Sequence, residues 1–294
     1  MNTYKVTRAA VREYMMGAKK AMESEQRVLV VGAGSPNADM VAEVLRSEGV
    51  TAEWTDQVKR PSIRHIMRVG VVYGIYLQTC SRYILVAKLL GKITIVHFVG
   101  SDAYWVKREP SSWRRRYWRF VLNCCNLIFY VSPHLEQLVG RKGIVLPFPI
   151  LTATFRNAKR SSAIPDRDVL YYCPSGQTNE KIYRLSWITD FARQHPDEKI
   201  TIIGNSSHPA NYRLELPNVE IIPYVERSQM PTLYKRHKTL IRMTTEDGLA
   251  RMVHEAILCG LKVICNGSEV TEVPPEREPA EFASAFKRAL ADIR

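Results

Sequence analysis

The sequence contains no cysteine pattern that would mark a disulfide-rich or zinc-binding protein. Six cysteines are present, and none forms a C-x-x-C pair. They are Cys80, Cys124, Cys125, Cys173, Cys259 and Cys265. Most stand in apolar stretches, which is typical of buried, reduced thiols in a cytosolic protein.

Long uninterrupted apolar runs are also absent. The longest apolar region, ILVAKLLGKITIVHFVG, is broken by Lys88, Gly91 and Lys92, so it predicts the end of a helix followed by a strand. The first 26 residues have neither an apolar block nor a cleavage site, so we expect no signal peptide. These absences predict a cytoplasmic protein without a transmembrane span.

Charge is present in excess and is unevenly divided. The formal net charge is +13, and residues 1–150 hold 22 Lys and Arg against 11 Asp and Glu, which gives +11. Residues 151–294 hold the remaining 20 and 18, which gives +2. The basic half suits an anionic partner such as a lipid headgroup, a nucleic acid or a phosphorylated substrate.

β-Branched runs alternate with helical spacing in two successive blocks. RVLVVGAG, RVGVVYGIY, KITIVHFV and NLIFYVS are strand-like in the first block, and DVLYYC, EKITIIG, TLIRMT and KVICNG in the second. Residues 147–168 carry three prolines and little periodicity, which predicts a linker. We therefore expect an α/β protein of two Rossmann-like domains, 1–150 and 151–294, facing each other across a cleft, with a last helix at about 279–292 in the second.

Two turns of the first block carry candidate ligand contacts. In GAGSPNA, Gly32, Gly34 and Ser35 follow the first strand, where backbone N–H groups can approach a phosphate or a sugar. The motif is not G-x-G-x-x-G, because Asn37 occupies the third glycine position, and a plain tight turn is an equal explanation.

VHFVGSDAY follows the fourth predicted strand and carries the second set. His97, Ser101 and Asp102 lie where an open α/β sheet places ligands, and an imidazole near a carboxylate can stabilise developing charge. An ordinary polar loop, GSDAYW, closed by a histidine is the alternative.

The stretch VKREPSSWRRRYWRF concentrates cations and aromatic residues. The cations are Lys107, Arg108, Arg114, Arg115, Arg116 and Arg119. Trp113, Tyr117 and Phe120 recur at helical spacing, so one explanation is a solvated helix whose aromatic face packs on the core. The other is a surface for an anionic membrane or a nucleic acid.

The second block offers polar residues after two of its strands. PSGQTNEK supplies Ser175, Gly176 and Lys181 as candidate diphosphate contacts, although a turn with a solvated lysine explains it equally. Arg242 stands in an otherwise apolar strand, where an unpaired charge is costly. We expect it to reach a ligand or an acid such as Asp247.

TTEDGLARMVHEAILCG combines an acid–glycine loop with an apolar helix. Asp247 precedes Gly248 near the helix start, and Glu255 shares a helical face with Met252, Ala256 and Cys259. Capping is the ordinary explanation for Asp247, and a surface pair with Arg251 is the ordinary explanation for Glu255.

Together these segments resemble the retaining GT-B glycosyltransferases of the family 4 type. DGLARMVHEAILCGLKVICN is similar to the family's E-x7-E segment, with Asp247 in place of the first Glu and Glu255 as the second. VHFVGSDAY, YVSPHLEQLV and GIVLPFPI resemble its histidine loop, its "avS" strand with the following helix, and its interdomain crossing. The resemblance covers about residues 27–266.

The resemblance implies transfer of a sugar from a nucleotide-sugar donor, with retention at the anomeric carbon. Glu255 would accept hydrogen bonds from the ribose, and Asp247 with Gly248 would hold the donor sugar. Ser175, Gly176 and Lys181 would meet the diphosphate, with Arg242 compensating for Gln177 where the family has arginine. His97 would lie by the reacting sugar.

The resemblance also implies the remaining contacts of the first domain. Gly32, Gly34, Ser35, Ser101 and Asp102 would line the acceptor or phosphate side. No D-x-D motif is present, so we expect no obligatory metal or other cofactor.

The acceptor would be lipid-linked or a glycan, and a basic first domain would place the protein peripherally at the inner face of a membrane. The alternatives are a nucleotide-sugar epimerase, a non-catalytic sugar- or membrane-binding relative, and a sugar transferase acting on nucleic acid, for which no recognition helix is visible. The sequence does not indicate an oligomeric state.

Overall fold

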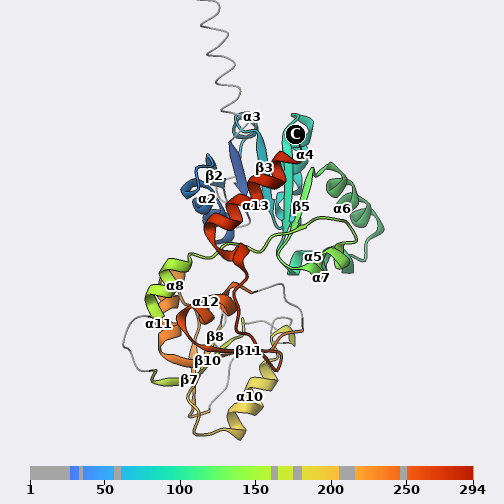
Figure 1. Ribbon diagram of the computed structural model, residues 1–294. Coiled ribbons are helices and arrows are strands. Elements are labelled where there is room, and N and C mark those ends of the chain that lie inside the picture. The colour runs from blue at the N-terminus through green and yellow to red at the C-terminus, as the bar shows by residue number, and fades with distance from the viewer. Residues whose placement is uncertain are drawn as a thin grey trace, which may run out of the picture. The chain divides into compact units, whose positions relative to one another are not determined.

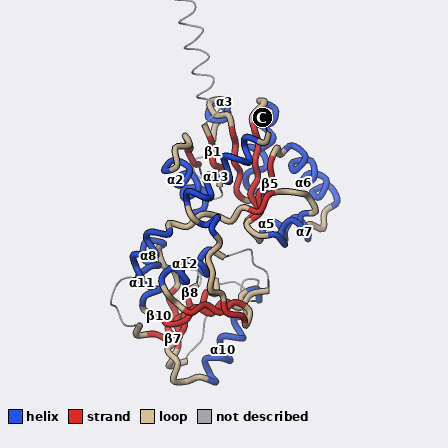
Figure 2. Tube along the Cα trace, viewed as in Figure 1, coloured by secondary structure: helices blue, strands red, loops and turns tan. Residues whose placement is uncertain are grey.

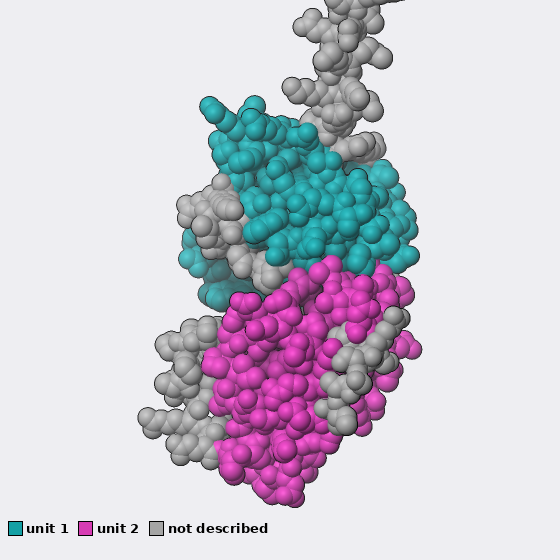
Figure 3. Space-filling model, turned by 90° about the vertical axis from the view of Figure 1, so that its left-hand side faces the viewer, with its two compact units in different colours: residues 1–149, 279–294 teal, residues 150–278 magenta. Residues whose placement is uncertain are grey.

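The computed structural model describes residues 27–32, 36–55, 61–159, 165–174, 181–204, 216–245 and 250–293. The chain divides into two compact units, drawn in two colours in Figure 3. Unit 1 is Met1–Pro149 together with Pro279–Arg294, and unit 2 is Ile150–Glu278.

Unit 1 is built on a parallel sheet of six strands in the order β2-β1-β3-β4-β5-β6 (Figure 1). The strands are β1 (Val28–Val31), β2 (Ala52–Thr55), β3 (Val71–Ile75), β4 (Ile93–Phe98), β5 (Leu127–Tyr130) and β6 (Ile144–Val145). Chain order reverses between β1 and β3, which is the point where open α/β sheets bind ligands at the carboxyl ends of the strands.

Helices cover both faces of this sheet, and two neighbouring residues of β3 each contact a helix on a different face. They are α2 (Pro36–Ser47), α3 (Ile63–Met67), α4 (Leu77–Leu89), α5 (Ser101–Arg108), α6 (Ser112–Cys124), α7 (Pro133–Val139) and α13 (Pro279–Ala291). A Cβ on Gly74 would lie 2.3 Å from Sγ of Cys80, so glycine lets α4 pack closely on one face. Tyr73 points to the opposite face and contacts Phe286 of α13, with ring centroids 5.6 Å apart.

The last helix therefore belongs to unit 1, whereas chain order had led us to assign residues 279–292 to the second domain. Phe282, Ala283, Phe286 and Ala289 form a buried stripe at helical spacing. This stripe packs into the core of unit 1, and α13 also contacts α2. The physical reason is apolar complementarity, which is independent of chain order.

Unit 2 has a second six-stranded sheet, in the order β12-β11-β10-β7-β8-β9 (Figure 2). Its strands are β7 (Arg167–Tyr172), β8 (Ile200–Ile203), β9 (Val219–Ile222), β10 (His237–Arg242), β11 (Lys262–Cys265) and β12 (Ser268–Glu269). All neighbours are parallel except β12, which pairs antiparallel with β11. Here chain order reverses between β7 and β10.

Four α-helices and two 3₁₀ turns complete the described part of unit 2. They are α8 (Thr152–Lys159), α10 (Leu185–Gln194), η2 (Arg227–Gln229), α11 (Met230–Lys235), α12 (Arg251–Cys259) and η3 (Pro275–Arg277). One apolar cluster joins Phe155 of α8, Leu233 and Tyr234 of α11, and Ala256 of α12.

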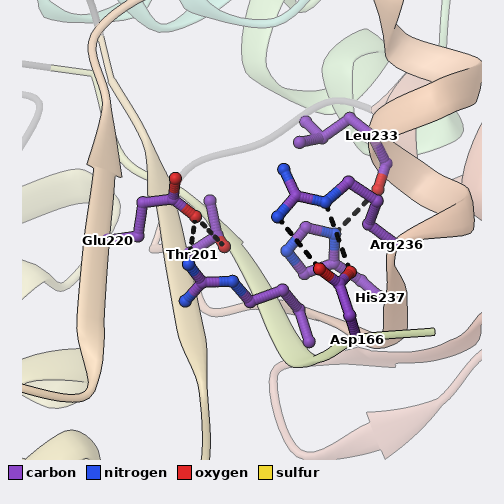
Figure 4. Close-up of polar contacts among 7 residues, drawn as sticks. Asp166, Thr201, Glu220, Leu233, Arg236 and His237 are labelled. Atoms are coloured by element: carbon purple, nitrogen blue, oxygen red, sulfur yellow. Dashed lines mark hydrogen bonds and ion pairs between the residues drawn. The ribbon is translucent and has the colours of Figure 1, made fainter.

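Charged pairs stabilise the N-terminal edge of this sheet (Figure 4). Arg236 donates to both carboxylate oxygens of Asp166 at 3.2 Å, and Arg167 lies 2.7 Å from Glu220. Nδ1 of His237 lies 2.7 Å from the carbonyl oxygen of Leu233. These residues hold the strand starts together, at the edge opposite the one where such sheets bind ligands.

Several local predictions were wrong. GSDAYW forms the first part of α5 instead of a loop, and the expected linker contains α8, whose Thr152 and Phe155 are buried. The short elements α3 and β12 were not predicted. None of the helices in the described part of the chain is both long enough and apolar enough to cross a membrane.

Candidate functional site

The carboxyl ends of β7 and β10 flank the reversal point of unit 2. The backbone N–H of Thr245, after β10, donates to the carbonyl of Ile182, after β7, at 2.9 Å. Asn266 donates its N–H to the carbonyl of Arg242 at 3.0 Å, and its side-chain oxygen accepts from the N–H of Thr244 at 2.8 Å. The segments that leave β7, β10 and β11 are thus fastened to one another.

Arg242 is the last residue of β10 and is buried. Its guanidinium carbon lies 5.5 Å from the ring centroid of Tyr172 and 5.2 Å from that of Tyr183, and the two rings meet edge to face. Nη1 lies 3.2 Å from Sδ of Met252 in α12. Cation–π contacts of this kind stabilise a buried cation and fix its orientation.

Lys181 is exposed at the start of the segment that leads into α10. The structure therefore places Arg242 at the reversal point of the sheet. Lys181 directly precedes Ile182, whose carbonyl accepts from the N–H of Thr245 after β10. Ser175, Gly176, Asp247 and Gly248, together with Gly34 and Ser35 of unit 1, lie outside the described residues.

Glu255 lies one turn into α12 and is only 5% exposed. Its Oε2 accepts a hydrogen bond of 3.1 Å from the hydroxyl of Tyr234 in α11. Burial raises the pKa of Tyr234 well above its ordinary value, and the nearby Glu255 raises it further, so the hydroxyl keeps its proton and is the donor.

The surface pair of Glu255 with Arg251 is not formed, and that explanation was wrong. Among the described residues no ion pair joins the two side chains, and Glu255 faces the apolar cluster instead. It was predicted to share a face with Met252, Ala256 and Cys259, and of these Ala256 and Cys259 are buried with it, whereas Met252 is partly buried.

His97 lies within β4, in the stretch KITIVHFV that was expected to form a strand, and it is fully buried instead of facing a ligand-binding loop. Its Nδ1 lies 2.5 Å from the hydroxyl of Tyr73, and its ring lies 4.4 Å from that of Phe148. Phe129 completes this side of the aromatic cluster. The contacts of His97 are those of a core residue.

Asp102 is buried in the first turn of α5 and closes the preceding loop. Its Oδ1 accepts from the N–H groups of Val99 at 2.9 Å and Gly100 at 3.0 Å. Burial raises the pKa of Asp102 to about 6, against the lowering effect of these backbone donors. Ser101 beside it is exposed.

Gly32 follows β1, and a packing constraint explains it. A Cβ at this position would lie 2.5 Å from the Cβ of Ala38, so glycine permits α2 to approach the sheet. This favours the turn explanation for Gly32.

The residues of α5, α6 and the intervening turn that form what we call the basic aromatic surface are all exposed. They are Lys107, Arg108, Arg114, Arg115, Arg116 and Arg119 with Trp105, Trp113 and Phe120. Trp113 is 65% exposed and Phe120 is 58% exposed, so the explanation that the aromatic face packs on the core does not hold for these two residues, whereas Tyr117 of the same face is partly buried. Val121 and Leu122 are the buried residues of α6 instead, and Tyr117 donates to Ser81.

Tyr172, Tyr183 and Tyr234 were missed from the sequence. Their sequence neighbours give no sign of a polar role, which appears only in the structure, where Tyr172 and Tyr183 contact Arg242 and Tyr234 donates to Glu255. Among the described residues no three His, Cys, Asp or Glu side chains are grouped so as to hold a metal ion. The expectation that no metal is needed stays a prediction.

No protein family model matches the chain, and no curated protein matches it in sequence. Solved structures do match across nearly the whole chain. HepE of Anabaena in complex with UDP-glucose gives a TM-score of 0.59 at 12% identity, covering 90% of each chain. Sucrose-phosphate synthase from Thermosynechococcus elongatus gives 0.59 at 12%, covering 91% of this chain and 90% of that one.

A UDP-forming α,α-trehalose-phosphate synthase from Burkholderia xenovorans gives a TM-score of 0.57 at 8% identity, with 90% and 91% covered. These structures are GT-B glycosyltransferases. At such identities the likeness shows the fold, and the chain has the GT-B fold of two Rossmann-like domains.

Proposed function

We propose that the protein is a glycosyltransferase that moves a hexose from a nucleotide-sugar donor to an acceptor with retention at the anomeric carbon. The observation that carries the proposal is the buried Glu255, held by Tyr234 in the unit whose segment 247–260 resembles the E-x7-E pattern. A buried carboxylate is costly unless polar groups compensate it, and ribose hydroxyls are suitable donors. HepE, which has the same fold, was solved with UDP-glucose, which supports a UDP-sugar as the donor to test first.

The chemistry assigned to unit 2 is stabilisation of the leaving diphosphate. Arg242, oriented by Tyr172 and Tyr183, and the exposed Lys181 would supply positive charge to the phosphates. Such fixed cations stabilise charge that develops in the transition state without a metal. Ser175 and Gly176 would offer backbone contacts, and Asp247 with Gly248 would hold the sugar.

The catalytic contacts proposed for His97 and Asp247 stay predictions. The burial of His97 in an aromatic cluster supports a packing role for it in unit 1. The acceptor contacts proposed for Gly32, Ser101 and Asp102 also stay predictions. Of these residues Ser101 is exposed, so it is the one that an acceptor can reach.

A thermal-shift screen against UDP-, GDP- and ADP-sugars tests the donor proposal. We expect one donor to raise the melting temperature of the wild type and to leave Glu255→Ala unshifted. Glu269→Ala, which removes an exposed acid of the same unit, is the matched control and should respond like the wild type. Absence of a shift with every donor contradicts the proposal, and binding without transfer identifies the non-catalytic alternative.

We also propose that the basic aromatic surface binds an anionic membrane that carries a lipid-linked acceptor, which would place the protein in the cytoplasm at the inner face of the membrane. Exposed Trp105, Trp113 and Phe120 among six cations fit a surface that is apolar inside and anionic outside. A nucleic acid is the rival partner, because the same residue types bind it.

Flotation with liposomes separates these partners. We expect recovery with anionic vesicles and little with neutral ones, and a loss of recovery when Arg114, Arg115 and Arg116 are all changed to Gln. The same change at Arg46, Arg64 and Arg68, exposed arginines of unit 1 outside the surface, is the charge-matched control. Equal recovery on neutral vesicles contradicts the membrane proposal. Salt-sensitive binding to a DNA duplex would instead favour nucleic acid as the partner.

A further inference from the structure

Tyr234 and Glu255 form a polar pair inside an apolar cluster of unit 2. Both side chains are buried, and the cluster around them includes Phe155, Leu258 and Cys259. The ring of Tyr234 lies 6.2 Å from that of Phe155, so packing fixes where its hydroxyl points. The hydroxyl reaches Oε2 of Glu255 at 3.1 Å.

The hydrogen bond from Tyr234 occupies only one of the two carboxylate oxygens of Glu255. Among the described residues Tyr234 is the one hydrogen-bond partner of the Glu255 carboxylate, and Oε1 accepts no bond from any of them. An ionised carboxylate accepts several hydrogen bonds, and in an apolar surrounding it gains most from each one. Glu255 is therefore oriented by one donor and has acceptor capacity left for a ligand.

We propose that Tyr234 is a positioning residue, which holds Glu255 so that Oε1 is the acceptor for the ribose hydroxyls of the donor nucleotide. This inference rests on the proposed function, since it names how the same site recognises ribose. The benefit is preorganisation, because a carboxylate already fixed by the protein loses less conformational freedom when the nucleotide binds.

Tyr234 affects nucleotide binding only through Glu255, and therefore only through the contacts made by the ribose. Tyr234 itself is enclosed in the cluster and has no exposed surface with which to touch a nucleotide. Its removal should thus weaken only those ligands that carry the hydroxyls, and should leave the contributions of base and diphosphate unchanged.

The test combines Tyr234→Phe with removal of the ribose hydroxyls. Binding of UDP and of 2′,3′-dideoxy-UDP is titrated into both proteins, with the GDP and ADP pairs alongside. We expect UDP to bind about tenfold more weakly to the variant, the scale of one hydrogen bond to a charged group. Dideoxy-UDP should bind equally to both, because the coupling disappears with the hydroxyls.

Tyr130→Phe is the matched control. It also removes a buried tyrosine hydroxyl, whose hydrogen bond goes to the carbonyl of Arg141 at 2.7 Å in unit 1. We expect it to lower the melting temperature and to leave UDP affinity unchanged. If Tyr234→Phe melts near room temperature, the titrations are made in the cold, with folding checked by circular dichroism.

The outcomes distinguish a failure of the proposed function from a failure of the positioning role of Tyr234. A wild type that binds none of UDP, GDP and ADP overturns the proposed function. A wild type that binds UDP while Tyr234→Phe binds it equally well overturns the positioning role alone. Equal weakening of UDP and dideoxy-UDP also overturns it, because that result indicates general loosening of unit 2.

Discussion

The two units share one architecture and differ in what their polar residues do at the carboxyl ends of the strands. In unit 1 His97 is enclosed by Tyr73, Phe129 and Phe148, and Asp102 accepts from the backbone of its own loop. In unit 2 the guanidinium of Arg242 contacts the rings of two tyrosines, and Glu255 is held through one oxygen. In the first unit Asp102 is bonded within its own loop through Oδ1, and its Oδ2 has no hydrogen-bond partner among the described residues. In the second unit Glu255 is held by the side chain of another helix.

This difference teaches that burial alone does not separate a structural polar residue from a ligand-binding one. Asp102 and Glu255 are both buried acids. Each carboxylate has one oxygen that accepts and one that accepts from no described residue, so the distinguishing observation is the partner. Asp102 bonds the backbone of its own loop, whereas Glu255 is bonded by the side chain of Tyr234 from another helix. Four substitutions test this distinction.

The largest effect is expected for His97→Ala. Removing a fully buried ring should lower the free energy of unfolding by about 3–4 kcal/mol, the cost of a large core truncation, with nucleotide affinity unchanged. Denaturant unfolding followed by UDP titration measures both. A variant of normal stability that binds donor and fails only in transfer would show that His97 reaches the reacting sugar after all.

Asp102→Asn should change how stability depends on pH. Because the pKa of the folded Asp102 is raised to about 6, its protonated form favours the fold. This contribution is complete below the pKa of the unfolded chain and is lost as pH rises through about 6. Across that range the wild type should lose roughly 3 kcal/mol more than Asp102→Asn, in which the amide oxygen can still accept from Val99 and Gly100.

Unfolding curves measured from pH 4 to pH 8 on both proteins isolate this term, since their difference cancels the other titrating groups. Identical pH profiles would show that Asp102 is not a buried titrating acid. UDP affinity should be equal in the two proteins, in contrast with the next substitution.

Glu255→Gln should weaken UDP binding about thirtyfold, or about 2 kcal/mol, because charge-assisted bonds to ribose become neutral ones. The amide oxygen can still accept from Tyr234, so stability should change less than affinity. Isothermal titration beside thermal unfolding reports the two quantities separately. An unfolding loss without an affinity loss would make Glu255 structural, like Asp102.

The smallest effect is expected for Arg242→Lys. The charge stays, but the planar group that contacts the rings of Tyr172 and Tyr183 is lost, so UDP should bind roughly tenfold more weakly, with UMP less affected. Arg236→Lys, which alters the charged pair with Asp166 at the opposite edge of the same sheet (Figure 4), is the control and should bind UDP normally. Equal effects of the two substitutions would argue against a phosphate contact.

Strand positions could be predicted because buried parallel strands need apolar runs rich in β-branched residues, and β3 and β4 carry them. It was harder to predict from the sequence which neighbours a side chain would contact. His97 was expected at the carboxyl end of its strand as a candidate ligand contact, yet Tyr73 and Phe148 contact its ring in the core of unit 1. Polarity in the sequence does not show which neighbours compensate it.

The aromatic residues of α6 illustrate the same limit. Trp113, Tyr117 and Phe120 have the spacing of a core-facing stripe, but Val121 and Leu122 are the fully buried residues of the helix, and Trp113 and Phe120 are exposed. Periodicity sets which residues share a face, and only the packed structure shows which face is inside. The burial of Glu255 agrees with its predicted place beside Ala256 and Cys259, which are buried too, whereas its contact with ribose stays a prediction.

The return of α13 to unit 1 has a consequence for how the protein is made. Unit 2 is a continuous insertion between Pro149 and Pro279, and its two ends are joined where the N–H of Ile150 donates to the carbonyl of Arg277 at 2.8 Å. Unit 1 receives Phe282 and Phe286 only after unit 2 has left the ribosome. The second unit can therefore complete its core during synthesis, whereas the first waits for the last helix and is the half exposed to chaperones and proteases.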